Sequence, residues 1–359
     1  MPQALALFAH TALKFTMARN RDRRLLLLTH GGFPDRAKTA IGLLRYGSDP
    51  IVAIVDPDQP PGTTVDASIA DLPPVPFTRT VEAAPQADVA VVGVAPIGGG
   101  LSDPLRRAIL QAIDAGYDIW AGLHDQLAED PTIAARAEEA DVELWDVRAV
   151  SPEPRVASGT PHPGEGRVVL TVGSDCSTGK MTATMALRDA ARTAGIDVGV
   201  VATGQTGVMI TGTGVVVDRV IADFAAGAVE AAVAAATLDH ELVLVEGQGS
   251  IIHPAYSGVT MALLHGARPD ALVLSHSADR AHVRGYPEVP IPPLETLTEL
   301  YESLAAPVHP ARVVAGVLNT HGLGLATAER AIAEMATNLG VPVTDPVRFD
   351  PASIIDVLR

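Results

Sequence analysis

The chain has little cysteine, little lysine and few aromatic residues, and each scarcity narrows the interpretation. Cys176 is the single cysteine among 359 residues, so no disulfide can form within the chain, and this usage is typical of a reducing compartment. Aromatic residues make up 4% of the chain, whereas 47% is hydrophobic. Ala, Val, Leu and Ile must therefore build the core, which favours α/β layers with buried parallel strands.

Long apolar runs and an excess of positive charge are also missing. No segment approaches the ~18 consecutive apolar residues of a membrane-spanning helix, and the first residues lack the pattern of a signal peptide. The formal net charge of −16 opposes binding to nucleic acids or anionic membranes. We therefore expect a cytoplasmic protein without nucleic-acid or membrane partners, in which an anionic ligand needs a locally positive pocket.

A segment rich in proline and glycine, residues 151–166, divides the chain. Its four prolines and three glycines cannot continue a helix or a central strand. We predict an N-terminal domain over residues 1–150, this linker, and a C-terminal domain over residues 167–359.

The N-terminal domain alternates buried-strand runs with helical patterns, which predicts a Rossmann-like parallel sheet. The expected strands are 25–29, 51–55, 87–93 and 119–122, and the expected helices are 38–46 and 104–115. Gly31, Gly32 and Asp56 at strand ends are similar to a dinucleotide site, although the G-x-G-x-x-G order is absent and such glycines are common in α/β sheets. Lys38 is the candidate anion contact here, or else a solvated helix lysine.

A phosphate loop opens the C-terminal domain. An apolar run at 168–172 precedes a Gly-rich turn with a lysine, and a helical pattern follows at 183–192. Backbone N–H groups and a helix N-terminus hold phosphate oxygens, and the lysine adds a point charge. The predicted cofactor contacts are Gly173, Ser174, Asp175, Cys176, Ser177, Thr178, Gly179, Lys180, Met181 and Thr182.

This loop departs from the usual pattern in two ways. Five residues separate Gly173 from Gly179, a spacing similar to that of dethiobiotin synthetase, an ATP-dependent ligase. Met181 stands where a Mg²⁺-binding Ser or Thr usually follows the lysine. Thr182 is rotated by about 100° on the helix and should point elsewhere. Phosphate binding is thus favoured over Mg²⁺-nucleotide hydrolysis, and we predict no metal site.

Polar residues follow the other expected strands, 197–203, 241–245, 271–275 and 312–318, and should converge on one rim. Glu246 and His276 are alternative general bases, and Lys180 is a further catalytic candidate. Asn319 could read a purine edge or simply form a turn. Further substrate contacts are expected at Gln205, Thr206, Gln248, Ser250, His253, Arg280 and Arg284.

Some of these residues have simpler interpretations. Arg280 could form an ion pair with Asp279, or bind a carboxylate as Arg284 could. Cys176 is interpreted as loop packing, because no histidine is visibly paired with it. We expect a loop at 210–214 and an ordered, proline-rich loop bordering a site at 285–293.

Read together, the motifs at 38–46, 173–180, 204–207, 245–250, 253–258 and Asn319 carry a family resemblance. The chain resembles a two-domain family long catalogued as a domain of unknown function, with a Rossmann-like N-terminal domain and a P-loop C-terminal domain, which includes D-glutamate N-acetyltransferase. The resemblance implies acetyl transfer from acetyl-CoA to the amine of an acidic amino acid, D-glutamate, with the loop holding the phosphates of coenzyme A. An ATP- and Mg²⁺-dependent ligase or kinase and a non-catalytic nucleotide sensor are the alternatives. Relatives of this type often pair, so we expect a homo-oligomer.

Overall fold

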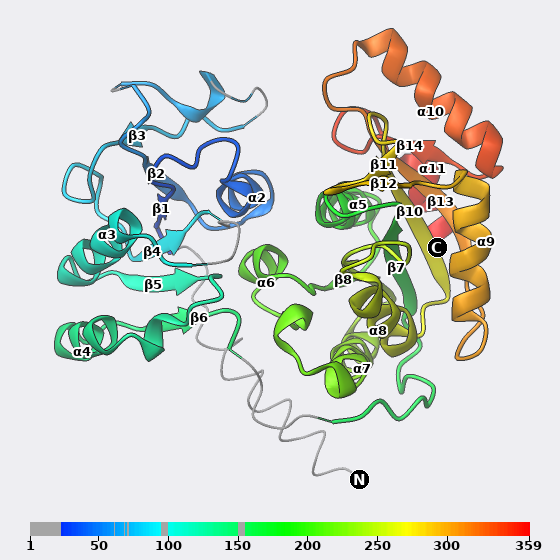
Figure 1. Ribbon diagram of the computed structural model, residues 1–359, viewed down its shortest axis with the longest axis horizontal. Helices are drawn as coiled ribbons and strands as arrows, with labels where there is room; N and C mark the ends of the chain where they lie inside the picture. Colours follow the sequence, from blue (N-terminus) through cyan, green and yellow to red (C-terminus); the bar gives the residue numbers. More distant parts are fainter. Residues whose placement is uncertain (1–22, 61, 68, 70–71, 95–99, 150–154) are drawn as a thin grey trace. The chain divides into compact units, whose positions relative to one another are not determined.

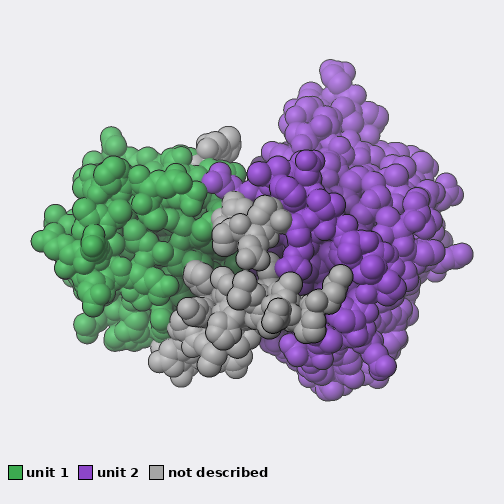
Figure 2. All heavy atoms as spheres, turned by 90° about the horizontal axis from the view of Figure 1, so that it is seen from below, with its two compact units in different colours: residues 1–150, 205–213 green, residues 151–204, 214–359 purple. Residues whose placement is uncertain are grey.

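The computed structural model describes residues 23–60, 62–67, 69, 72–94, 100–149 and 155–359. The chain separates into two compact units, shown in Figures 1 and 2. Unit 1 comprises residues 1–150 with 205–213, and unit 2 comprises residues 151–204 with 214–359. The first four residues of the predicted linker lie outside the described residues.

Unit 1 contains a six-stranded sheet in the order β3-β2-β1-β4-β5-β6, and its strand pairs are parallel. This order confirms the Rossmann-like prediction. The central strands are continuous apolar runs because both faces are covered, as in β1 with four buried leucines. The strands are β1 Leu25–Leu28, β2 Ile51–Val55, β3 Phe77–Thr78, β4 Val89–Val92, β5 Asp118–Ala121 and β6 Leu144–Asp146.

The helices of unit 1 bury one apolar stripe each. In α3 (Asp103–Asp114) the stripe recurs at three- and four-residue spacing and packs into the core of the unit. In α4 (Pro131–Ala140) the Asp130 side chain accepts hydrogen bonds from Thr132 N and Ile133 N, which fixes the start of the helix. The remaining helices before the linker are α2 Lys38–Tyr46 and the short 3₁₀ turns η1 Val65–Ala67 and η2 Leu127–Glu129.

A helix from the C-terminal half of the sequence completes unit 1. This helix, α6 (Gln205–Thr211), packs against α2, and the hydroxyls of Thr39 and Thr206 lie 2.9 Å apart in buried positions. Its apolar residues at 208–210 are buried, so the predicted loop at 210–214 is wrong for its first two residues. Ala202 and Gly214 flank the segment that contains α6, and in unit 2 they pair as an isolated parallel bridge.

Unit 2 contains a second six-stranded sheet, in the order β14-β13-β10-β7-β9-β8, and its strand pairs are parallel. The strand that leads into the phosphate loop, β7, lies between β10 and β9, so the loop emerges from the middle of the sheet. The strands are β7 Arg167–Gly173, β8 Val198–Val201, β9 Leu242–Val245, β10 Ala271–Ser277, β13 Arg312–Asn319 and β14 Val343–Thr344.

Helices cover both faces of this sheet, so alternate strand residues enter two different cores. On β7, Val168, Leu170 and Val172 join one core with α7, α8 and α9, and Val169 joins another with α5 and α11. The helices are α5 Lys180–Thr193, α7 Ala222–Asp239, α8 Ser257–Ala267, α9 Leu294–Ala305, α10 Leu325–Leu339, α11 Ala352–Leu358 and the 3₁₀ turn η3 Val217–Arg219.

One predicted loop of unit 2 is partly a hairpin. Strands β11 (His282–Val283) and β12 (Tyr286–Pro290) pair antiparallel, so the ordered loop expected over 285–293 is a strand at 286–290. The prolines there lie in an edge ribbon, where their missing N–H groups cost no central ladder bond. Among the described helices, none is long and apolar enough to cross a membrane.

Candidate phosphate-binding site

The phosphate loop is a tight turn between β7 and α5. Its backbone is left-handed at Ser177 (φ 55°) and at Gly179 (φ 102°), where the chain reverses into the helix. Within the part of the chain that the structure describes, the amides of residues 177–179 donate no hydrogen bond to a protein acceptor. Consecutive unpaired N–H groups in front of a helix N-terminus are the kind of arrangement to which anions bind in other proteins.

Lys180 folds back over this turn. Its side chain is buried, with 6% exposure, and Nζ donates a hydrogen bond to the Asp175 carbonyl at 2.7 Å. Two glycines make room for it: a Cβ at Gly173 would lie 2.8 Å from Lys180 Nζ, and one at Gly247 would lie 3.1 Å from Lys180 Cδ. The cation is therefore held at the loop by packing that requires glycine on either side.

The residue after the lysine supplies no oxygen ligand. Met181 is buried, with 7% exposure, in the first turn of α5. The hydroxyl of Thr184, one turn further along, donates to the Lys180 carbonyl at 2.9 Å. Mg²⁺ prefers oxygen ligands, and a thioether offers none.

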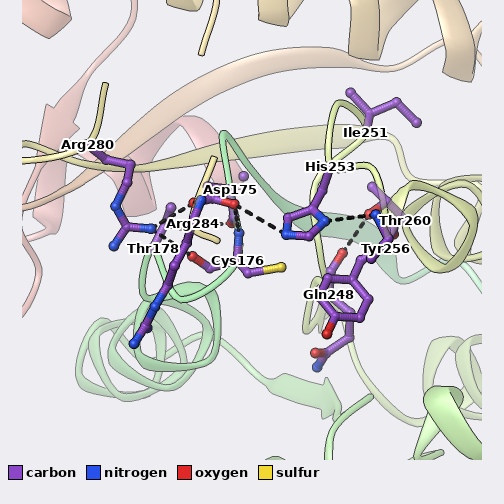
Figure 3. A network of polar contacts seen from close by, with 12 residues as sticks. Asp175, Cys176, Thr178, Gln248, Ile251, His253, Tyr256, Thr260, Arg280 and Arg284 are labelled. Carbon is purple, nitrogen blue, oxygen red and sulfur yellow. Dashed lines mark hydrogen bonds and ion pairs between the residues drawn. The ribbon is translucent and has the colours of Figure 1, made fainter. Parts of the chain in front are cut away.

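Asp175 organises the other side of the loop through its fully buried carboxylate (Figure 3). One carboxylate oxygen accepts hydrogen bonds from Arg280 Nη1 at 2.7 Å and from the Arg284 amide at 2.8 Å. The other accepts from the Cys176 amide at 2.7 Å. The predicted pair of Asp279 with Arg280 is wrong, because Asp279 accepts from the Ser277 hydroxyl instead. The exposed Arg284 side chain extends away from this carboxylate.

His253 faces the same carboxylate. Its Nδ1 accepts a hydrogen bond from the Ala255 amide at 3.1 Å, which leaves the proton on Nε2, 3.9 Å from Asp175. Burial lowers the pKa of His253, against the attraction of Asp175. The ring lies 4.6 Å from that of Tyr256 and 5.2 Å from that of Tyr286. A buried neutral imidazole thus links the loop to an aromatic cluster.

The histidine near Cys176 is a contact that sequence reasoning missed. Ligand atoms of Asp175, Cys176 and His253 lie within 4.8 Å of one another, a spacing that a metal ion could bridge. Protein donors already use Asp175 on both oxygens and His253 at Nδ1. The cluster is therefore an internally bonded support for the loop.

Glu246 holds the segment that leads into α6. It follows β9 and is 3% exposed, and one carboxylate oxygen accepts from the amides of Thr203 at 3.1 Å and Gly204 at 3.3 Å. The other oxygen accepts from Gln248 Nε2 at 3.2 Å. These hydrogen bonds hold the carboxylate against the start of the segment that leads into α6.

His276 approaches the loop from β10, which neighbours β7, and Asn319 approaches it from β13, the strand beyond β10. His276 Nδ1 lies 2.7 Å from the Ser174 hydroxyl, and burial together with Arg280 lowers the pKa of the imidazole. Asn319 ends β13, accepts a hydrogen bond from the His321 amide at 3.0 Å, and directs its amide nitrogen toward Gly179. The predicted convergence of strand ends on one rim is therefore present for these side chains.

Other predicted residues lie elsewhere. Gln205 and Thr206 belong to α6 and hence to unit 1, as does the exposed Lys38 at the start of α2. Thr182 is half-buried on α5, and Ser250 is buried in unit 2. A residue that the sequence did not reveal is Tyr301 of α9, whose hydroxyl donates to the Gly173 carbonyl at 2.8 Å and accepts from the Ile251 amide at 3.0 Å. Nothing in its helical pattern distinguishes it from a core tyrosine.

Comparison with known proteins places this architecture in a family. Residues 155–355 match a domain of unknown function described as a DUF1611 P-loop domain, and residues 59–150 match the DUF1611 Rossmann-like domain. A DUF1611 family protein from Anabaena variabilis has a similar crystal structure, with a TM-score of 0.89 and 38% identity over 94% of this chain and 99% of its own.

Two curated relatives carry the name D-glutamate N-acetyltransferase. The protein from Tritonibacter scottomollicae is 38% identical over 92% of this chain and 97% of its own length. The protein from a Pseudoalteromonas species is 38% identical over 74% of this chain and 79% of its own length. The relatives support an N-acetyltransferase interpretation, and with both domain models matched, the chain belongs to the DUF1611 family of paired Rossmann-like and P-loop domains.

Proposed function

We propose that this chain transfers the acetyl group of acetyl-CoA to the amine of an acidic amino acid, D-glutamate, and that loop 173–182 binds the phosphates of coenzyme A. The geometry of the loop carries the proposal. Three unpaired amides lie directly before α5, the buried Lys180 lies over the same turn, and Met181 supplies no metal ligand. The names of the two curated relatives support the reaction and the acceptor.

An ATP-dependent ligase is the second candidate, favoured by the five residues between Gly173 and Gly179. Such an enzyme needs Mg²⁺ on oxygen ligands near the β- and γ-phosphates. The position after Lys180 is apolar, and the Glu246 carboxylate already accepts three hydrogen bonds from the protein. A coenzyme A phosphate held by amides and a lysine requires no such metal.

The predicted catalytic residues can be assigned by whether they lie near the phosphates or near the thioester of coenzyme A. Acyl transfer to an ammonium group needs a base near the amine, and the sequence predicts Glu246 or His276 for that role. His276 contacts loop residue Ser174, whereas the thioester lies at the far end of the pantetheine arm from the diphosphate. We therefore assign Lys180 to the phosphate, and His276 and Glu246 to shaping the site around it.

Ligand-induced stabilisation tests this proposal. Acetyl-CoA should raise the melting temperature of the wild-type chain, whereas ATP with Mg²⁺ should not. Lys180→Ala should weaken acetyl-CoA binding by about 10- to 150-fold, the equivalent of one charge-assisted hydrogen bond. Arg312→Ala is the matched control, because it removes an exposed positive charge at the amino end of β13, the opposite edge of the same sheet.

Turnover separates the remaining alternatives. Release of the coenzyme A thiol on addition of D-glutamate supports the transferase. Stabilisation by ATP and Mg²⁺ without a response to acetyl-CoA would favour the ligase, and acetyl-CoA binding without thiol release against a panel of D- and L-amino acids would favour a sensor.

A further inference from the structure

Unit 1 has a pocket of about 230 Å³, open to solvent, at the carboxyl edge of its sheet; it is called the cavity below. His30 and Arg79 follow β1 and β3, and Pro104 and Arg107 belong to the first two turns of α3. Ligands of open α/β sheets bind at this edge. Pockets for drug-sized ligands measure ~300–1,000 Å³, so the volume suits a small metabolite better than a dinucleotide.

The lining of this cavity is positive in a strongly acidic chain. Its seven residues include two arginines and a histidine but no acidic residue, although the chain has 42 Asp and Glu against 26 Lys and Arg. Arg79 and Arg107 are exposed, and neither forms an ion pair or hydrogen bond with any residue in the described ranges. The N-terminus of α3 adds partial positive charge, and Ser102 before it makes no side-chain cap.

His30 is held at this cavity in an unusual conformation. Its backbone is left-handed, with φ 41°, which is uncommon for a residue other than glycine and frequent at functional sites. The buried Asp56 imposes it, because its carboxylate accepts hydrogen bonds from Thr29 Oγ1 at 2.8 Å, Gly31 N at 2.9 Å and Phe33 N at 3.2 Å. The same bonds leave Asp56 unsuited to the ribose contact of a dinucleotide site.

The imidazole of His30 has unused hydrogen-bonding capacity. Its Nδ1 is buried and has no partner among the described residues. Burial lowers the pKa of His30, and Arg107 acts in the same direction against Asp56 and Asp58. A neutral imidazole offers one donor and one acceptor to a ligand.

We propose that this cavity binds the amino acid that accepts the acetyl group, with Arg79 and Arg107 on its two carboxylates and His30 as a hydrogen-bonding partner. Guanidinium groups bind carboxylates bidentately, and two of them match a ligand with two acid groups. The identity of the ligand rests on the proposed function, whereas its dianionic character rests on the lining of the cavity.

Titration calorimetry of the full chain tests the site, with D-glutamate and glutarate as probes in the presence and absence of coenzyme A. Arg79→Gln and Arg107→Gln should each weaken both probes by about tenfold or more. Each should raise KM for D-glutamate by a similar factor and change KM for acetyl-CoA by less than about twofold. Arg24→Gln is the matched control, because Arg24 is exposed at the amino edge of the same sheet, where it pairs with Asp88.

The outcomes separate this inference from the proposed function. Wild-type affinity for D-glutamate in both arginine variants overturns the inference even where acetyl transfer is intact. If the wild type transfers no acetyl group, the proposed function fails, but the glutarate titration still tests the cavity. Weaker glutarate binding in the two variants would support a dianion site there. Absence of glutarate binding by the wild type would overturn it.

Discussion

Gly247 provides the sharpest test of how the phosphate site is built. It follows Glu246 at the end of β9, and its amide donates to the Thr171 hydroxyl at 2.9 Å. A Cβ added at this position would lie 1.7 Å from the Thr171 carbonyl oxygen and 3.1 Å from Lys180 Cδ. Because one of these atoms belongs to the backbone of the central strand β7, no side-chain rotation can relieve the overlap.

The size of the effect follows from these contacts. Overpacking a well-packed site costs about 1–3 kcal/mol, and the backbone clash places Gly247→Ala near the upper value. Loss of the hydrogen bond to Thr171 adds about 1 kcal/mol. We therefore expect a loss of about 3–4 kcal/mol in the free energy of unfolding of unit 2. Displacement of Lys180 should also weaken acetyl-CoA binding by at least about tenfold.

Urea unfolding followed by two probes measures this effect. Both tryptophans, Trp120 and Trp145, lie in unit 1, so fluorescence reports that unit and far-UV circular dichroism reports both. The matched control is Gly258→Ala at the start of α8, where an added Cβ meets nothing within 4 Å. The control should stay within about 0.5 kcal/mol of the wild type. A Gly247→Ala variant within 1 kcal/mol of this control would refute the reasoning.

Two further variants probe the groups around the loop. Asp175→Asn turns an amide nitrogen toward existing donors and leaves Arg280 without its anion, so urea unfolding should show a loss of about 3–5 kcal/mol; a loss below ~1 kcal/mol contradicts this. Because burial holds the pKa of His276 below the ~6.5 of free histidine, the unfolded chain binds its proton more readily, and stability falls as pH drops below ~6.5. His276→Asn should lessen that fall between pH 7 and 5.5, and parallel pH profiles would argue against it.

The fold was largely predictable because its strands are buried on both faces. Runs such as 25–28 and 242–245 are continuously apolar, a pattern that β-branched and leucine-rich parallel strands share. The phosphate loop was equally predictable from the sequence, because the spacing of its glycines and lysine reflects backbone requirements within ten consecutive residues. Short edge strands such as β14, with two residues, carry too little pattern to be recognised.

The pairings within the site were not predictable. Strand-end geometry indicates which side chains share a rim, but the partner of each depends on loop conformation. Asp175 and Arg280 lie on different loops, and Ser174 meets His276 across neighbouring strands. Proximity in the sequence suggested Asp279 as the partner of Arg280, because the two opposite charges are adjacent in the chain.

Helix α6 lies in the C-terminal half of the sequence but belongs to unit 1. A double-mutant cycle can measure how strongly it is coupled to that unit. The buried hydroxyls of Thr39 on α2 and Thr206 on α6 bond each other at 2.9 Å. Thr39→Val and Thr206→Val should each cost about 1–3 kcal/mol by stranding the other hydroxyl, and the double variant should cost little more than one of them. Tryptophan fluorescence during urea unfolding reads this out in unit 1 directly, and a coupling energy of about 1–2 kcal/mol is expected. If the two single losses of unfolding free energy add to within about 0.5 kcal/mol of the double loss, Thr39 and Thr206 are not coupled. That result would contradict the assignment of α6 to the folding unit that contains α2.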